Sequence, residues 1–121
     1  MSTYRALLTQ EGSAAPSATV KKNTTGMSVV PVRDSMGNFA LEFSGAIDPA
    51  SVEINCRSVH QQDPDDGLYT VTAFCGNAST NRIVIVTCVQ TKDTQGDDFY
   101  VLASPRCVDG VLKNWSIEVR L

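Results

Sequence analysis

The sequence has few features of an exported, membrane-bound or nucleic-acid-binding protein. Its 121 residues contain no apolar run near the roughly 18 residues that a membrane-spanning helix requires. The N-terminal stretch also lacks the apolar core of a signal peptide. Lys and Arg number 10 against 13 for Asp and Glu, so a basic surface for phosphate groups is not expected. We therefore expect a soluble protein that is made in the cytoplasm and binds neither nucleic acid nor membrane.

Patterns for catalysis are equally scarce. His60 is the only histidine, and Ser58 and Asp63 lie close to it in the sequence. Three such residues in one loop seldom reach the geometry of nucleophile, base and orienting acid, and no Gly-x-Ser-x-Gly elbow accompanies them. We expect no enzymatic activity and no cofactor, with a hydrolase as the least favoured alternative.

One acidic loop is a weak candidate for calcium. Carboxylates gather before Gly67 and again in a later loop: Asp63, Asp65 and Asp66, then Asp97 and Asp98. Calcium prefers oxygen ligands of this kind, but the spacing is not that of an EF-hand loop. Aspartate is also common in turns because it hydrogen-bonds to nearby backbone groups. A solvated turn is the favoured interpretation, and no metal site is predicted.

Four cysteines are spread between residues 56 and 107: Cys56, Cys75, Cys88 and Cys107. No two of them have the two-to-four-residue spacing that structural zinc sites favour. Cytosolic synthesis keeps thiols reduced, which argues against disulfides. Each cysteine lies in or beside an apolar β segment, so buried free thiols are expected.

The dominant positive signal is alternation of apolar and polar residues at the period of a β-strand. Residues 82–89 are the longest β-branched run, with Ile83 and Ile85 on one face and Val84 and Val86 on the other. A run of this kind is typical of a strand covered on both faces. About nine strands are expected, at residues 3–9, 18–22, 28–33, 39–43, 52–57, 68–75, 82–89, 99–103 and 115–121. No window has a helical period, so the predicted fold class is all-β, an antiparallel sandwich or barrel of eight to nine strands.

Some of this apolar β surface exceeds what one sandwich core needs. Apart from the second face of residues 82–89, three valines surround Pro31, and the interface candidates are Val84, Val86, Val29, Val30 and Val32. Because proline cannot donate to a β-ladder, the strand that holds Pro31 is expected at a sheet edge or with a bulge. Exposed apolar strands invite aggregation, so we predict an oligomer or a docking interface. The alternative is that the loop at residues 90–98 folds over this face.

A few aromatic residues could form a sugar-binding platform. Tyr69, Tyr100 and Trp115 have the flat faces that stack on the apolar side of a pyranose. Trp115, however, alternates with Ile117 and Val119, so core packing is its expected environment. Tyr69 and Tyr100 remain weak sugar-stacking candidates.

The N-terminal part resembles a known group of proteins. Residues 4–12 read Tyr-Arg-Ala-Leu-Leu-Thr-Gln-Glu-Gly, and residues 15–20, 23–26, 29–30 and 45–47 read Ala-Pro-Ser-Ala-Thr-Val, Asn-Thr-Thr-Gly, Val-Val and Gly-Ala-Ile. Over residues 4–47 this segment is similar to small, mostly uncharacterised proteins encoded in bacteriophage genomes and bacterial prophage regions. Pro31 stands where that group more often has an aromatic residue, and the second half of the chain lies outside the resemblance.

The resemblance implies a structural protein of the virion that is made in the host cytoplasm. It would serve as a capsid decoration, head-fibre or neck or tail accessory protein, with other virion proteins as partners. Phage appendages are commonly trimeric, so the resemblance favours a homotrimer. A carbohydrate-binding module on a phage appendage is the alternative. Length alone favours a single domain over residues 1–121.

Overall fold

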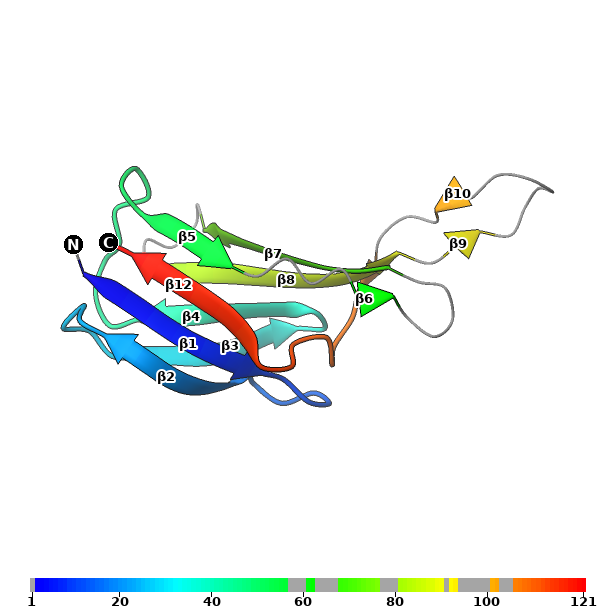
Figure 1. The fold of residues 1–121 in the computed structure, drawn as a ribbon, viewed down its shortest axis with the longest axis horizontal. Coiled ribbons are helices and arrows are strands. Elements are labelled where there is room, and N and C mark those ends of the chain that lie inside the picture. The colour runs from blue at the N-terminus through cyan, green and yellow to red at the C-terminus, as the bar shows by residue number, and fades with distance from the viewer. Residues whose placement is uncertain are drawn as a thin grey trace.

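The structure of the protein, a computed structural model, describes residues 2–56, 61–62, 68–76, 81–90, 92–93, 101–102 and 106–121. Strands and their connections account for all of these residues. Within these ranges, no helix is long and apolar enough to cross a membrane. The two chain ends lie side by side, and the Leu121 amide donates to the Ser2 carbonyl oxygen at 2.9 Å (Figure 1).

The strands form two main antiparallel sheets that face each other (Figure 1). The smaller sheet has the order β2 (Ser17–Asn23), β1 (Thr3–Thr9), β12 (Trp115–Arg120) and β5 (Glu53–Cys56). The larger sheet has the order β3 (Val29–Ser35), β4 (Asn38–Phe43), β8 (Arg82–Gln90), β7 (Leu68–Cys75) and β6 (Gln61–Gln62), and β11 (Arg106–Cys107) also pairs with β8. β9 (Lys92–Asp93) pairs with β10 (Val101–Leu102). The predicted all-β sandwich is confirmed, and the sheets do not close into a barrel over the described residues.

The core forms where the inner faces of the two sheets meet. Alternating residues supply it, as the period of two requires: Tyr4, Ala6, Leu8, Phe39, Leu41, Phe43, Ile83, Ile85, Trp115, Ile117 and Val119. Trp115 is 1% exposed, so its expected core packing is confirmed. The ring of Tyr4 meets that of Phe43 edge-on, with the centroids 5.8 Å apart.

β8 is the central strand of the larger sheet, between β4 and β7. Its inner residues are fully buried, but the outer ones, Val84, Val86 and Cys88, are only partly buried. Both faces of this strand were expected to be covered. In the single chain, only the inner face is fully covered.

The strand that holds Pro31 lies at the edge of the larger sheet, as predicted. The Ser44 amide donates to the Ser28 carbonyl at 2.9 Å, and hydrogen-bonded pairs alternate along an antiparallel ladder. Val30 therefore points its backbone groups at β4, and Pro31 points its own at the free edge. Proline thus takes the position where its missing amide costs no ladder bond. The bulge in this strand lies further on, between Arg33 and Ser35.

A buried glutamine fastens the loop after β1 to the connection before β12. Gln10 is 1% exposed. Its Nε2 donates to the carbonyl oxygens of Gly12 at 2.8 Å and Ala14 at 3.0 Å, and its Oε1 accepts from the Gly110 amide at 2.7 Å. All the hydrogen-bonding capacity of the amide except one lone pair is therefore used, which is what lets so polar a group lie in the interior.

A second polar cluster holds the β3–β4 hairpin against the same connection. Arg33 Nη2 donates to Asp109 Oδ2 at 2.8 Å, and the Gly37 amide donates to Asp109 Oδ1 at 2.9 Å. The Arg33 hydrogen bond, helped by the Gly37 amide, holds the pKa of Asp109 below its usual range although burial acts in the opposite direction. Gly37 has φ +69°, and a Cβ there would lie 2.6 Å from both Thr87 O and Val108 N. Only glycine fits this turn.

Candidate interaction surface

The strand register assembles an apolar row on the outer side of the larger sheet. Val32 pairs with Ala40, Ala40 with Val84, and Val84 with Phe74, so one rung runs across β3, β4, β8 and β7. Residues two positions apart on a strand share a face, which adds Val30 and Val86 to the same side. We call this set the outer apolar face: Val30, Val32, Ala40, Phe74, Val84 and Val86.

The outer apolar face keeps a substantial exposed area. Val30 is 55% exposed and Phe74 45% exposed, while the other valines of the set are partly buried. Full burial of a side chain of this kind contributes about 1.5–3 kcal/mol, so covering either residue would still contribute about 1 kcal/mol. Exposed apolar side chains that gather on the outer side of a sheet are typical of a protein-interaction site.

A charged side chain crosses the middle of this face. Arg82 lies opposite Glu42, but its Nη2 reaches Asp34 Oδ1 on β3 at a distance of 2.8 Å. β4 lies between β8 and β3, and Ala40 is its outer residue between those two positions. We infer that the aliphatic stem of Arg82 passes over Ala40, which explains why Ala40 is only 1% exposed. The outer apolar face thus carries a guanidinium paired to one carboxylate and 3.8 Å from that of Glu42.

Three edges of the two sheets, in contrast, carry features that oppose strand addition. β3 presents Pro31 to its open edge, β2 is interrupted by a bulge and carries Lys21 and Lys22, and β5 is short and begins at Glu53. Proline, lysine, bulges and short strands are the usual devices that prevent edge-to-edge pairing. These features oppose pairing at β3, β2 and β5, whereas β7 beyond Tyr69 has no described strand on its side away from β8.

The structure separates the five valines predicted for the interface. Val30, Val32, Val84 and Val86 lie on the outer apolar face, but Val29 pairs with Phe43 and packs against the core. Val29 therefore does not share the outer apolar face with the other four valines, because neighbours in a strand point to opposite sides. Ala40, Phe74 and Arg82 could not be recognised from the sequence, since only the pairing of four strands brings them together.

Most of the other predicted sites fall on residues outside the described ranges. These are Asp63, Asp65, Asp66, Asp97 and Asp98 for calcium, His60 with Ser58 for a hydrolase, and Tyr100 for a sugar. Tyr69 is described, and it is partly buried in β7. Where side chains are described, no group of three or more His, Cys, Asp or Glu residues could hold a metal ion.

The four cysteines are free thiols and only partly buried, which corrects the expectation of full burial. Cys56 and Cys75 pack against the core from the two different sheets. Cys88 follows Val86 on the outer side of β8. Burial raises the pKa of the Cys56 thiol, so this group stays protonated at neutral pH.

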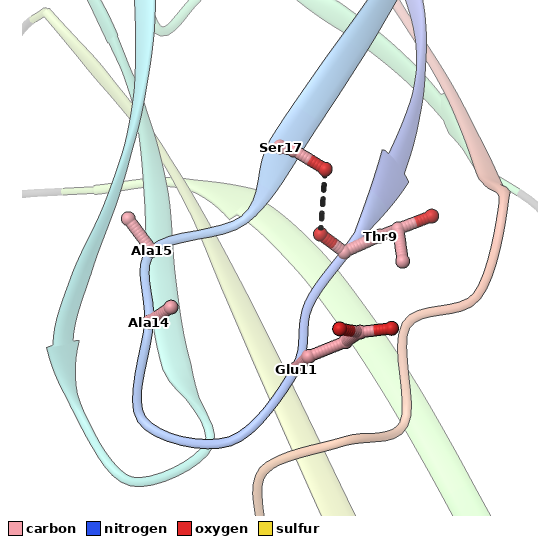
Figure 2. Close-up of a pocket in the computed structure, with 5 residues that line it drawn as sticks. All are labelled: Thr9, Glu11, Ala14, Ala15 and Ser17. Carbon is pink, nitrogen blue, oxygen red and sulfur yellow. Dashed lines mark hydrogen bonds between the residues drawn. The ribbon is translucent and has the colours of Figure 1, made fainter.

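A shallow hollow lies where β1 leads into β2 (Figure 2). It has a volume of about 300 Å³ and is lined by Thr9, Glu11, Ala14, Ala15 and Ser17. The Ser17 hydroxyl donates to the Thr9 carbonyl oxygen at 3.2 Å, and the two alanines lie across the loop from Thr9 (Figure 2). Among the described residues, its lining has one carboxylate and no aromatic ring, so these residues provide neither a stacking surface for a sugar nor a base–nucleophile pair.

No family of known proteins, curated protein or solved structure matches the chain.

Proposed function

We propose that the protein is a non-enzymatic structural component of a bacteriophage particle, such as a capsid decoration, head-fibre or neck or tail accessory protein. The resemblance of residues 4–47 to phage and prophage proteins supports the virion assignment. The protein acts through protein–protein contacts, with other virion proteins and with further copies of itself, most simply as a trimer.

The observation that carries the proposed contact role is the apolar surface that the outer apolar face leaves exposed. Val30 and Phe74 leave about half of their surface exposed on the outer apolar face. Pro31 and the lysines of β2 meanwhile discourage pairing at the β3 and β2 edges. A surface of this kind suits a partner that packs flat against the sheet.

The carbohydrate-binding alternative lacks a comparable observation in the described part of the chain. Trp115 is buried in the core, and the hollow near Glu11 has no ring in its lining. We therefore do not propose it.

Mass spectrometry of purified particles tests the virion role. Particles of the phage or prophage that encodes the chain are banded by density and compared with the lysate from which they came. We expect the protein in the band at a constant ratio to the major capsid protein, and an abundant host protein of similar size serves as the control for carry-over. Hundreds of copies per particle would indicate capsid decoration, and a few dozen a neck or tail part. Presence in the lysate with depletion from the band to the level of the host control would overturn the proposal.

A further inference from the structure

Two of the four cysteines face each other across neighbouring strands. Cys107 on β11 is the direct partner of Cys88 on β8. The Val108 amide donates to the Thr87 carbonyl at 3.1 Å, so the cysteines, one position on, form the non-hydrogen-bonded pair of the ladder. Cα atoms at such a pair are about 4.5 Å apart. That separation lies within the range of about 4.4–6.8 Å over which disulfides form.

The thiol groups of the two cysteines also lie near each other, and both are partly exposed. Thr87 and Val89 point into the core, and Cys88 between them points outward. Burial raises the pKa of the Cys88 thiol, and the charge of Cys107 and a hydrogen bond between the two side chains act in the same direction. The amide Nδ2 of Asn38 lies 3.8 Å from Cys107 Sγ. The two sulfurs therefore meet on the outer side of the larger sheet, and neither is fully enclosed.

We propose that Cys88 and Cys107 are a reversible dithiol–disulfide pair that is oxidised by low-molecular-weight disulfides such as glutathione disulfide. The thiolate of one cysteine attacks the small disulfide and forms a mixed disulfide, and one small thiol leaves. The second cysteine then gives up its proton and attacks the mixed bond, which forms the Cys88–Cys107 disulfide and releases the second small thiol. Two protein thiols are oxidised, and one small disulfide is reduced to two thiols.

The bond would covalently tie β11 to β8. The β8–β11 pairing spans two residues on β11, so it gains from a covalent tie more than the long pairing of β8 with β7. A cross-link of this kind stabilises the fold because it restricts the unfolded chain. The inference does not depend on the proposed virion role.

The other two cysteines provide a matched control. Cys56 lies opposite Ile117 in the smaller sheet, and Cys75 lies opposite Ile83 in the larger one. Neither has a cysteine as its strand partner, and both pack against the core. They should remain reduced in the native protein under conditions that close the outer pair.

Peptide mapping decides the matter because trypsin separates the cysteines onto four peptides, residues 34–57, 58–82, 83–92 and 107–113. The folded protein is incubated with glutathione disulfide, blocked with an alkylating reagent, digested without reductant and analysed by mass spectrometry. We expect peptide 83–92 linked to peptide 107–113, with the other two alkylated, and the link should disappear after dithiothreitol. The double variant Cys56→Ser/Cys75→Ser should form the same link.

Single variants test whether the second cysteine is needed to resolve the mixed disulfide. Cys88→Ser and Cys107→Ser should each stop at a glutathione adduct on the remaining thiol. The oxidised wild-type protein should also have a higher Tm than the reduced protein, a difference that both single variants lose. Three outcomes would each overturn the proposal. They are glutathione adducts on both cysteines without a disulfide between them, a link that involves Cys56 or Cys75, and four thiols that remain free until the protein is denatured.

Discussion

Replacement of Gln10 by alanine should be among the most destabilising single changes outside the apolar core. The variant removes two donated bonds, to Gly12 O and Ala14 O, and one accepted bond from the Gly110 amide. Each such bond contributes about 1 kcal/mol net, and the groups left without partners lie next to a side chain that is 1% exposed. We expect a loss of about 3 kcal/mol in the free energy of unfolding.

Urea denaturation followed by circular dichroism measures this loss. With an m-value of about 2 kcal/mol/M, the midpoint of Gln10→Ala should fall by about 1.5 M. Gln10→Glu should cost at least as much at neutral pH, because a carboxylate offers no donor to the two carbonyl oxygens that now accept from Nε2. Glu11→Ala, at the exposed neighbour, is the control and should change the stability by less than about 0.5 kcal/mol. A loss below about 1 kcal/mol for Gln10→Ala would refute the reasoning, since water would then have replaced the glutamine.

Three further changes test other parts of the fold. The folded-state pKa of Asp109 is lowered, chiefly by its hydrogen bond to Arg33. The contribution of Asp109 to the free energy of unfolding is therefore fully present above its unfolded-state pKa of about 3.9, and it disappears as the pH falls through its folded-state pKa. In urea titrations, the wild-type protein should therefore be more stable than Asp109→Asn, and this difference should be larger at pH 7 than at pH 3. The same difference at both pH values would contradict this. Gly37→Ala should lower the free energy of unfolding by about 3 kcal/mol, because it combines a positive φ with a Cβ clash. Gly12→Ala, with φ +56° and open space around the new Cβ, should lower it by about 1 kcal/mol. Equal losses would show that the clash is absent. Tyr4→Phe should keep or raise the thermal midpoint, since the buried Tyr4 hydroxyl has no hydrogen-bond partner in the described structure, and a loss above about 1 kcal/mol would contradict this.

Local alternation was enough to predict most of the strands. β1 and β7 have the bounds that the pattern indicated, and β8 extends only one residue further. These segments follow a period of two because one face packs in the core, and that requirement is visible in the sequence itself. The edge position of the strand that holds Pro31 could be predicted for an equally local reason, the missing amide.

The candidate surface could not be predicted to the same degree, because it depends on register between distant strands. Val84 and Val86 were recognisable as the second face of an apolar strand, but Phe74 joins them only through the pairing of β7 with β8. The two-residue β11 was not among the expected strands, so the opposition of Cys88 and Cys107 could not be predicted. Pairings of this kind depend on tertiary contacts, which the pattern of a short stretch of sequence does not show.

Light scattering coupled to size-exclusion chromatography tests most directly whether the outer apolar face is the contact surface. The wild-type protein at micromolar concentration is compared with Phe74→Lys, Val84→Lys and the control Val20→Lys, whose valine is 51% exposed on the other sheet. Circular dichroism verifies that each variant is folded. We expect a trimer for the wild-type protein and for Val20→Lys, and a monomer for folded Phe74→Lys and Val84→Lys, because a lysine ammonium cannot be buried unpaired in an apolar contact. A monomeric wild-type protein, or an oligomer that both outer-face variants preserve, would contradict self-association through this face.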